Sequence, residues 1–150
     1  MRNARIIALI LWILAIASLA SAKQLAVVID TANPTTNVSA VDLIKLLNLK
    51  IHNWSDGKPV MIIMRDPGAA DMQLYLRRVL NMTAEQARSF IQSHKSSIML
   101  ADSDDVILSY VSRNPGAVGI VDLYSLTKDV NVLKIDGKLP VEQGYLLRGN

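Results

Sequence analysis

Residues 114–121 read NPGAVGIV, and this stretch marks the end of one secondary-structure element and the start of another. Pro115 cannot continue a helix, and Gly116 tolerates backbone angles that other residues avoid, so the first three residues predict a helix end and a tight turn. Residues 117–121 form a short apolar run, which is typical of a buried strand. The stretch therefore predicts a helix, a turn and a buried strand in succession.

The same alternation of strands and helices extends along the chain on both sides of this stretch. Short apolar runs predict further buried strands at residues 25–30, 60–64, 98–100 and 132–135. Helices are expected between them, after caps at Ser39, at Thr83 and at either Asp102 or Ser103, and over the apolar stripe of residues 72–80. Alternating strands and helices favour βαβ units. The sequence therefore predicts a three-layer α/β domain, with a mainly parallel sheet flanked by helices.

Residues 1–22 have the pattern of a cleavable secretory signal. A positively charged start is followed by an uninterrupted apolar run over residues 6–17. Small residues then lead to Ala22, so cleavage is expected between Ala22 and Lys23. The alternative is a retained membrane anchor, for which the run is short because a spanning helix needs about 20 apolar residues. We expect a protein that is exported and keeps residues 23–150 as its single domain.

The charge of the exported part argues against a nucleic-acid partner. The chain has 16 basic and 13 acidic residues, but Arg2 and Arg5 belong to the predicted signal, so the remaining net charge is +1 rather than +3. A surface that binds nucleic acid needs clustered Lys and Arg residues. The densest basic cluster in the remaining chain is the single pair Arg77-Arg78.

The sequence contains no pattern that indicates catalysis or metal binding. The chain has no cysteine, which excludes disulfides and thiolate metal sites. His52 and His94 are 42 residues apart and lack neighbouring ligands at the spacing of a zinc site. No serine lies in a Gly-x-Ser-x-Gly turn. We therefore expect a protein that is not an enzyme and has neither a cofactor nor a metal site.

Several segments together resemble phosphate-type periplasmic substrate-binding proteins. Residues 43–57 (LIKLLNLKIHNWSDG) are similar to a segment of that family in which a helix is followed by Trp-x-Asp/Ser-Gly. The stretch NPGAVGIV is similar to the family's PGAIGYV segment. Residues 133–140 (LKIDGKLP) and 144–148 (GYLLR) resemble the end of the same unit. The resemblance covers residues 24–148, and the order of the segments also fits.

This resemblance implies one lobe of a type II periplasmic binding protein. Family members capture an oxyanion for an ABC transporter in the bacterial periplasm, so the resemblance implies a periplasmic or secreted protein that binds phosphate or a similar small oxyanion. Complete members close two lobes on the ligand, and this chain is long enough for one. The implied partners are a membrane transporter or sensor, or a second copy of the chain.

The resemblance places a ligand loop at residues 65–70. Arg65 matches the family's ligand arginine, and Asp66 takes the place of its acidic residue. Pro67-Gly68-Ala69-Ala70 stands where the family has Gly-Ser-Gly-Thr, so neither of the family's two hydroxyls is present. Backbone N–H groups at a helix start attract anions, and an arginine can hold an oxyanion through two hydrogen bonds. The predicted ligand-binding site consists of Arg65, Asp66, Gly68, Ala69 and Ala70.

Two alternatives remain at this point. Arg65 and Asp66 could form a surface ion pair near a helix cap, with no ligand. The chain would then be a protein-interaction or sensory accessory module that has kept the fold and lost ligand binding. Trp54 also has two interpretations, because it could bind a partner or pack under the following strand; the family favours packing.

Overall fold

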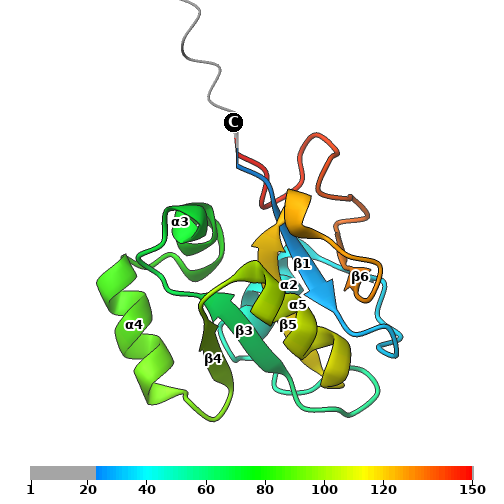
Figure 1. Ribbon diagram of the computed structural model, residues 1–150, viewed down its shortest axis with the longest axis horizontal. Helices are drawn as coiled ribbons and strands as arrows, with labels where there is room; N and C mark the ends of the chain where they lie inside the picture. Colours follow the sequence, from blue (N-terminus) through cyan, green and yellow to red (C-terminus); the bar gives the residue numbers. More distant parts are fainter. Residues whose placement is uncertain (1–22, 150) are drawn as a thin grey trace, which may run out of the picture.

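The computed structural model describes residues 23–149, and the predicted signal lies outside this range. The first and last described segments lie side by side, because Leu25 N–H donates to Leu147 O at 3.0 Å and Gly149 N–H donates to Lys23 O at 2.7 Å (Figure 1). None of the helices in this range is long and apolar enough to cross a bilayer.

A mixed sheet of five strands forms the centre of the domain, in the order β4-β3-β5-β1-β6. The strands are β1 (Leu25–Ile29), β3 (Met61–Arg65), β4 (Ile98–Ala101), β5 (Ala117–Asp122) and β6 (Asn131–Val132). β3 is parallel to β4 and β5, whereas β1 is antiparallel to both β5 and β6. Four of the five strands therefore run in one direction, which confirms the predicted mainly parallel sheet.

The prediction of one strand over residues 132–135 is wrong. The chain changes partner at the fully buried Leu133, so β6 pairs with β1, while β7 (Lys134–Ile135) pairs with β2 (Asn37–Val38) in a separate two-stranded sheet. Leu133 N–H donates to Val27 O at 2.9 Å and Lys134 N–H donates to Thr36 O at 3.0 Å. The buried Leu133 lies between the segment that pairs with β1 and the segment that pairs with β2. It therefore divides the predicted strand into two short strands.

The predicted helix starts are confirmed, and the structure assigns the cap of the last one. The helical elements are α2 (Ala40–Leu47), η1 (Ala70–Met72), α3 (Gln73–Tyr75), η2 (Leu76–Leu80), α4 (Ala84–Ser93), α5 (Asp104–Arg113) and η3 (Leu123–Ser125). Ser39 caps α2, Thr83 and Gln86 form a capping box at α4, and Ser103 rather than Asp102 caps α5. The stripe over residues 72–80 forms three short helical segments instead of one regular helix, and η2 has π-helical geometry.

Two apolar layers lie on opposite faces of the sheet. Alternate residues of β1 divide between them: Val27 belongs to the layer under α2, η2 and α4, and Val28 belongs to the layer under α5. Figure 1 shows these helices arranged around the sheet. Alternation of side chains along each strand supplies both layers, which explains why the apolar runs are continuous. The predicted three-layer α/β domain is therefore confirmed.

The end of the sheet where β3 and β5 begin is fixed by buried hydrogen bonds around Gly116. Its N–H donates to Oδ2 of the buried Asp30 at 3.0 Å, and its carbonyl accepts from Trp54 Nε1–H at 2.9 Å. Gly116 has a φ of +89°, and a Cβ at this position would overlap the carbonyl oxygen of Pro59. Trp54 is 5% exposed, so the structural interpretation of this tryptophan is confirmed.

Candidate functional site

The predicted ligand loop leaves β3 at the opposite end of the sheet, where the parallel strands finish. Its central feature is Oδ1 of Asp66, which accepts Gly68 N–H at 2.7 Å and Arg88 Nη2–H at 3.0 Å. The Arg88 hydrogen bond and, next, the Gly68 N–H lower the pKa of Asp66 below its ordinary value. A backbone donor and a guanidinium therefore converge on one carboxylate oxygen.

Arg88 is a site residue that the sequence reasoning missed. It projects from α4, 22 residues after Asp66, and no local motif links the two positions. Gly68 makes the contact possible, because a Cβ at this position would overlap the guanidinium of Arg88. The glycine at the centre of the predicted loop therefore matters for the close approach of a cation rather than for an unusual backbone angle.

Arg65 has a different partner from the one the surface-pair interpretation gave it. Its Nη1 lies 3.6 Å from Oδ1 of Asp104, at the start of α5, and both side chains are largely covered. Oδ2 of the same carboxylate accepts Asp122 N–H at 3.0 Å and the Ser125 hydroxyl at 2.8 Å. The structure thus pairs Arg65 with Asp104 and Asp66 with Arg88, and the interpretation of Arg65 and Asp66 as one ion pair is wrong.

Ala69 and Ala70 contribute only backbone to the loop. Ala69 N–H donates to Asp66 O at 2.9 Å, and Ala69 O accepts Met72 N–H at 3.0 Å. Ala69 precedes η1 and provides no side-chain cap, and Ala70 is the first residue of that turn. The hydroxyls of the family's loop therefore have no counterpart among these two side chains, and any ligand contact here depends on N–H groups.

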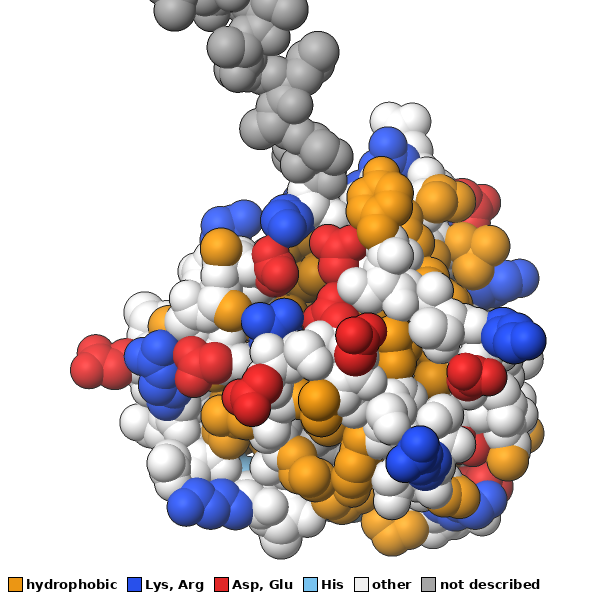
Figure 2. All heavy atoms as spheres, in the orientation of Figure 1, with side chains coloured by type: hydrophobic (Ala, Val, Ile, Leu, Met, Phe, Trp, Pro, Cys, Tyr) orange, Lys and Arg blue, Asp and Glu red, His pale blue; other side chains and the backbone are white. Residues whose placement is uncertain are grey.

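Acidic and basic side chains are interspersed at this end of the sheet, where β3 and β5 finish. Lys23 Nζ lies 2.8 Å from Asp71 Oδ1 and 3.9 Å from Asp122 Oδ2, and the Asp71 hydrogen bond raises the pKa of Lys23. Arg65 and Arg88 each have a carboxylate partner as well. Figure 2 shows red and blue side chains interspersed over the end of β5 and the start of α5. This end of the sheet is a mixed-charge surface rather than a basic cleft.

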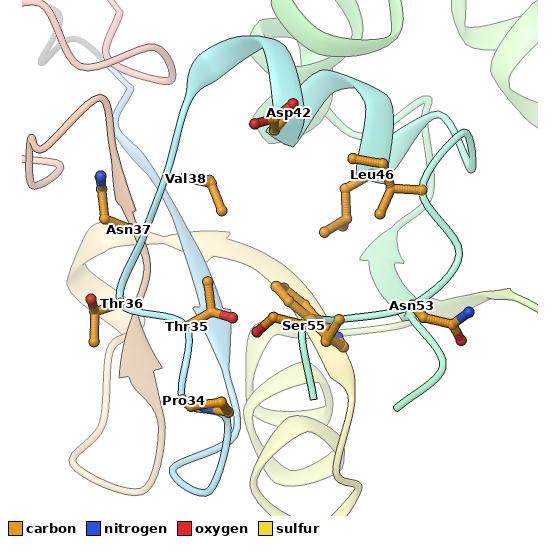
Figure 3. A pocket seen from close by; sticks show the side chains of 11 residues that line it. Pro34, Thr35, Thr36, Asn37, Val38, Asp42, Leu46, Asn53 and Ser55 are labelled. Atoms are coloured by element: carbon orange, nitrogen blue, oxygen red, sulfur yellow. The ribbon is translucent and has the colours of Figure 1, made fainter. Parts of the chain in front are cut away.

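A hollow lies at the other end of the sheet, beside Trp54. It has a volume of about 450 Å³, and Figure 3 shows its lining drawn from the loop before β2, from α2 and from the turn at Ser55. Hydroxyl and amide side chains dominate the polar part of the lining, with Asp42 as the one charged residue. Because the lining has a carboxylate and no cation, this hollow does not suit an oxyanion. Within residues 23–149, no group of three His, Asp or Glu side chains could hold a metal.

Comparisons with known proteins identify the fold. No protein-family model matches the chain, and no curated protein sequence matches it. A Borrelia burgdorferi PstS structure matches with a TM-score of 0.68 at 19% identity, covering 86% of this chain and 55% of PstS. A Clostridium perfringens protein assigned as a phosphate ABC transporter substrate-binding protein, solved with bound phosphate, matches with a TM-score of 0.67 at 20% identity over 79% of this chain and 47% of that protein.

An ABC-type phosphate transport receptor from Vibrio cholerae matches with a TM-score of 0.62 at 20% identity, over 85% of this chain and 55% of the receptor. The chain therefore has the α/β fold of these substrate-binding proteins and spans about half of their length. This extent is consistent with a single lobe, and the resemblance read from the sequence is confirmed at the level of the fold.

Proposed function

We propose that this protein is an exported, non-enzymatic binding module that captures a small oxyanion, with phosphate as the first candidate. The observation that carries the proposal is the position of Asp66 Oδ1, which accepts both Gly68 N–H and the Arg88 guanidinium. One oxygen of a bound oxyanion would take the same two donors, because backbone N–H groups and guanidinium groups are the usual protein ligands of such anions. The Asp66 carboxylate therefore occupies the position that we propose for one oxygen of the ligand.

Displacing the Asp66 carboxylate costs little. The side chains of Asp66 and Arg88 are 55% and 50% exposed, and exposed ion pairs are worth roughly 0–1 kcal/mol. The pair therefore weakens anion binding without blocking it. Arg65, the residue before Asp66, supplies a second cation at the same end of the sheet once its contact with Asp104 loosens.

The displaced carboxylate would also select among anions. Asp66 stays close to any ligand that takes its donors, and its negative charge repels an oxyanion that carries no proton. Monohydrogen or dihydrogen phosphate has a P–OH group that can donate to the carboxylate, whereas sulfate at neutral pH has none. We therefore expect phosphate to bind more tightly than sulfate.

The affinity of a single lobe should be low. If this lobe supplied half of the binding free energy of a micromolar site, Kd would be roughly 1 mM. An exported protein with so weak a site could hand phosphate to a membrane transporter or report its level to a sensor. The Clostridium perfringens and Vibrio cholerae proteins, both of which carry the fold over a longer chain, are named as a transporter component and a transport receptor.

The test is a titration of the purified protein with phosphate and sulfate, followed by amide chemical shifts at Gly68 and by thermal unfolding. Phosphate should shift the Gly68 amide and raise Tm, and Arg88→Ala should abolish both effects. Arg113→Ala is the matched control, because Arg113 is an exposed arginine at the end of α5, near the opposite edge of the sheet. Unchanged phosphate binding in Arg88→Ala would refute this site.

A second candidate function, protein interaction through the same end of the sheet, is favoured by Tyr124. This residue is 83% exposed directly after β5, and its N–H donates to Asp122 Oδ1 at 2.8 Å. An exposed tyrosine among mixed charges is typical of the residues that dominate protein–protein binding. If this candidate is correct, a partner protein should crosslink to the wild-type chain in the native cell envelope, and Tyr124→Ala should abolish that crosslink. Phosphate should then leave the Tm of the protein unchanged.

A further inference from the structure

The strand β4 forms one edge of the five-stranded sheet. Among the strands within residues 23–149 it pairs with β3 alone, and Ile62 N–H donates to Ser97 O at 2.8 Å. Because backbone groups alternate in direction along a strand, Met99 turns its N–H and C=O toward β3, and Leu100 turns its own away from the sheet. Among the described residues, no strand pairs with this outward donor and acceptor of Leu100.

Apolar side chains are exposed on both faces of this edge. Met99 is 36% exposed and Leu100 is 47% exposed, and Val106 in the first turn of α5 is 49% exposed. The neighbours Ile98 and Ala101 are buried in the two different core layers. Both layers therefore end at β4 in an uncovered apolar residue.

Apart from its short length of four residues, the edge lacks the sequence features that normally prevent strands from pairing with other molecules. Proteins protect edge strands with lysine, proline or a covering element, and Ile98–Ala101 contains neither lysine nor proline. Helix α4 packs onto one core layer through Ala87 and Ile91, and Leu100 remains about half exposed. The strand is therefore a surface suited to pairing with another strand.

The charges at the two ends of β4 indicate which strand would fit. Lys95 precedes the strand, and Asp102 and Asp105 follow it. All three are exposed, and none has an ion-pair partner within residues 23–149. An antiparallel copy of the same strand would place the basic end of each copy beside the acidic end of the other. A parallel copy would place like charges together.

We propose that the protein forms a symmetric dimer in which the β4 strands of two copies pair antiparallel and join the two sheets into one. A two-fold axis makes such a contact self-complementary and closed, so the second copy completes the edge without leading to further association. The dimer buries Met99 and Leu100 and pairs the outward backbone groups of Leu100. This contact is independent of the oxyanion loop.

The experiment uses the full protein as it is recovered from cells. Sedimentation over a range of concentrations measures its mass. The wild-type protein should change from monomer to dimer as concentration rises. Leu100→Lys places two lysines near the two-fold axis and should raise the dimer Kd by about tenfold or more. Val41→Lys is the matched control, because Val41 is 61% exposed on α2, away from the edge, and its Kd should match wild type.

A charge exchange separates this interface from any other. Lys95→Glu alone and Asp102→Lys alone should each weaken the dimer, because each places like charges together at both ends of the paired strands. The double variant with both changes should restore the dimer. A wild-type protein that stays monomeric at all concentrations would overturn the proposal. A dimer that neither Leu100→Lys nor the single charge changes weaken would also overturn it, because its interface would lie elsewhere.

Discussion

The two ends of the central sheet differ in how firmly their polar groups are held. Where β3 and β5 begin, the buried Asp30 and the nearly buried Trp54 both bond to Gly116. Where these strands finish, Asp66 and Arg88 pair at the surface with about half of each side chain exposed. The buried polar groups at the first end cannot exchange their hydrogen-bond partners for water. The exposed polar groups at the second end can. The segments around Gly116 and Trp54, which resemble the binding-protein family, lie at the first end, whereas the proposed ligand loop lies at the second.

This difference teaches that a segment which resembles a family can serve the fold rather than a binding site. The NPGAVGIV stretch and Trp54 serve to close the start of the sheet, because burial makes each of their hydrogen bonds costly to lose. Asp66, Gly68 and Ala70 in the loop after β3 are exposed, so these three residues can change without unfolding the domain. Function can be gained or lost there at small cost in stability.

The largest effect should come from Gly116→Ala. The new Cβ would overlap the carbonyl oxygen of Pro59, and the φ of +89° would strain any other residue. We expect the free energy of unfolding to fall by roughly 3 kcal/mol or more, measured by urea denaturation. Gly57→Ala is the control, because its φ is +86° and a Cβ there meets nothing within 4 Å. Equal losses in both variants would show that strain alone matters and that the first end is not tightly packed.

A smaller loss is expected for Asp30→Ala. This change leaves the buried Gly116 N–H without its acceptor and also removes the bond to Ala32 N–H at 3.0 Å. The free energy of unfolding should fall by about 2 kcal/mol, as for other buried donors that lose their partner. Asp56→Ala, in an exposed turn that also uses its carboxylate to accept backbone N–H, should cost less. A negligible loss in Asp30→Ala would break the contrast between the two ends.

At the other end, Arg88→Ala should change stability by no more than about 1 kcal/mol. Its clearer effect should be on the pKa of Asp66, which should rise toward the ordinary value when the guanidinium is removed. A carboxyl group with a lowered folded pKa contributes stability above its ordinary pKa, and that contribution disappears as pH falls through the folded pKa. Carboxyl shifts followed by NMR between neutral pH and strongly acidic pH would measure this. An unchanged Asp66 titration would mean that the contact is absent in solution.

The smallest effect on stability is expected for Gly68→Ala. Its Cβ would overlap only the end of the flexible Arg88 side chain, which can move away at little cost. The domain should keep the wild-type urea midpoint, while the pKa of Asp66 rises as it does in Arg88→Ala. A large loss of stability would show that this loop is as tightly packed as the Gly116 turn.

Local patterns predicted the elements of the fold but not all of their pairings. Capping signals placed the starts of α2, α4 and α5, since a side-chain cap acts within three residues of its own position. Residues 132–135 were predicted as one strand, because periodicity cannot show that the buried Leu133 separates two partners. The predicted loop includes Asp66 and Gly68, which the structure joins by a hydrogen bond, but Arg88 was missed because it reaches Asp66 from another helix.

The sequence by itself determined the α/β class, the order of elements and the two apolar layers, because burial patterns and caps depend on neighbouring residues. Only the tertiary structure decided which charges meet. It paired Arg65 with Asp104 and Asp66 with Arg88, and it placed β4 at the edge of the five-stranded sheet. The physical reason is that ion pairs between distant elements depend on a few ångströms of spacing, and no periodicity in the chain encodes that spacing.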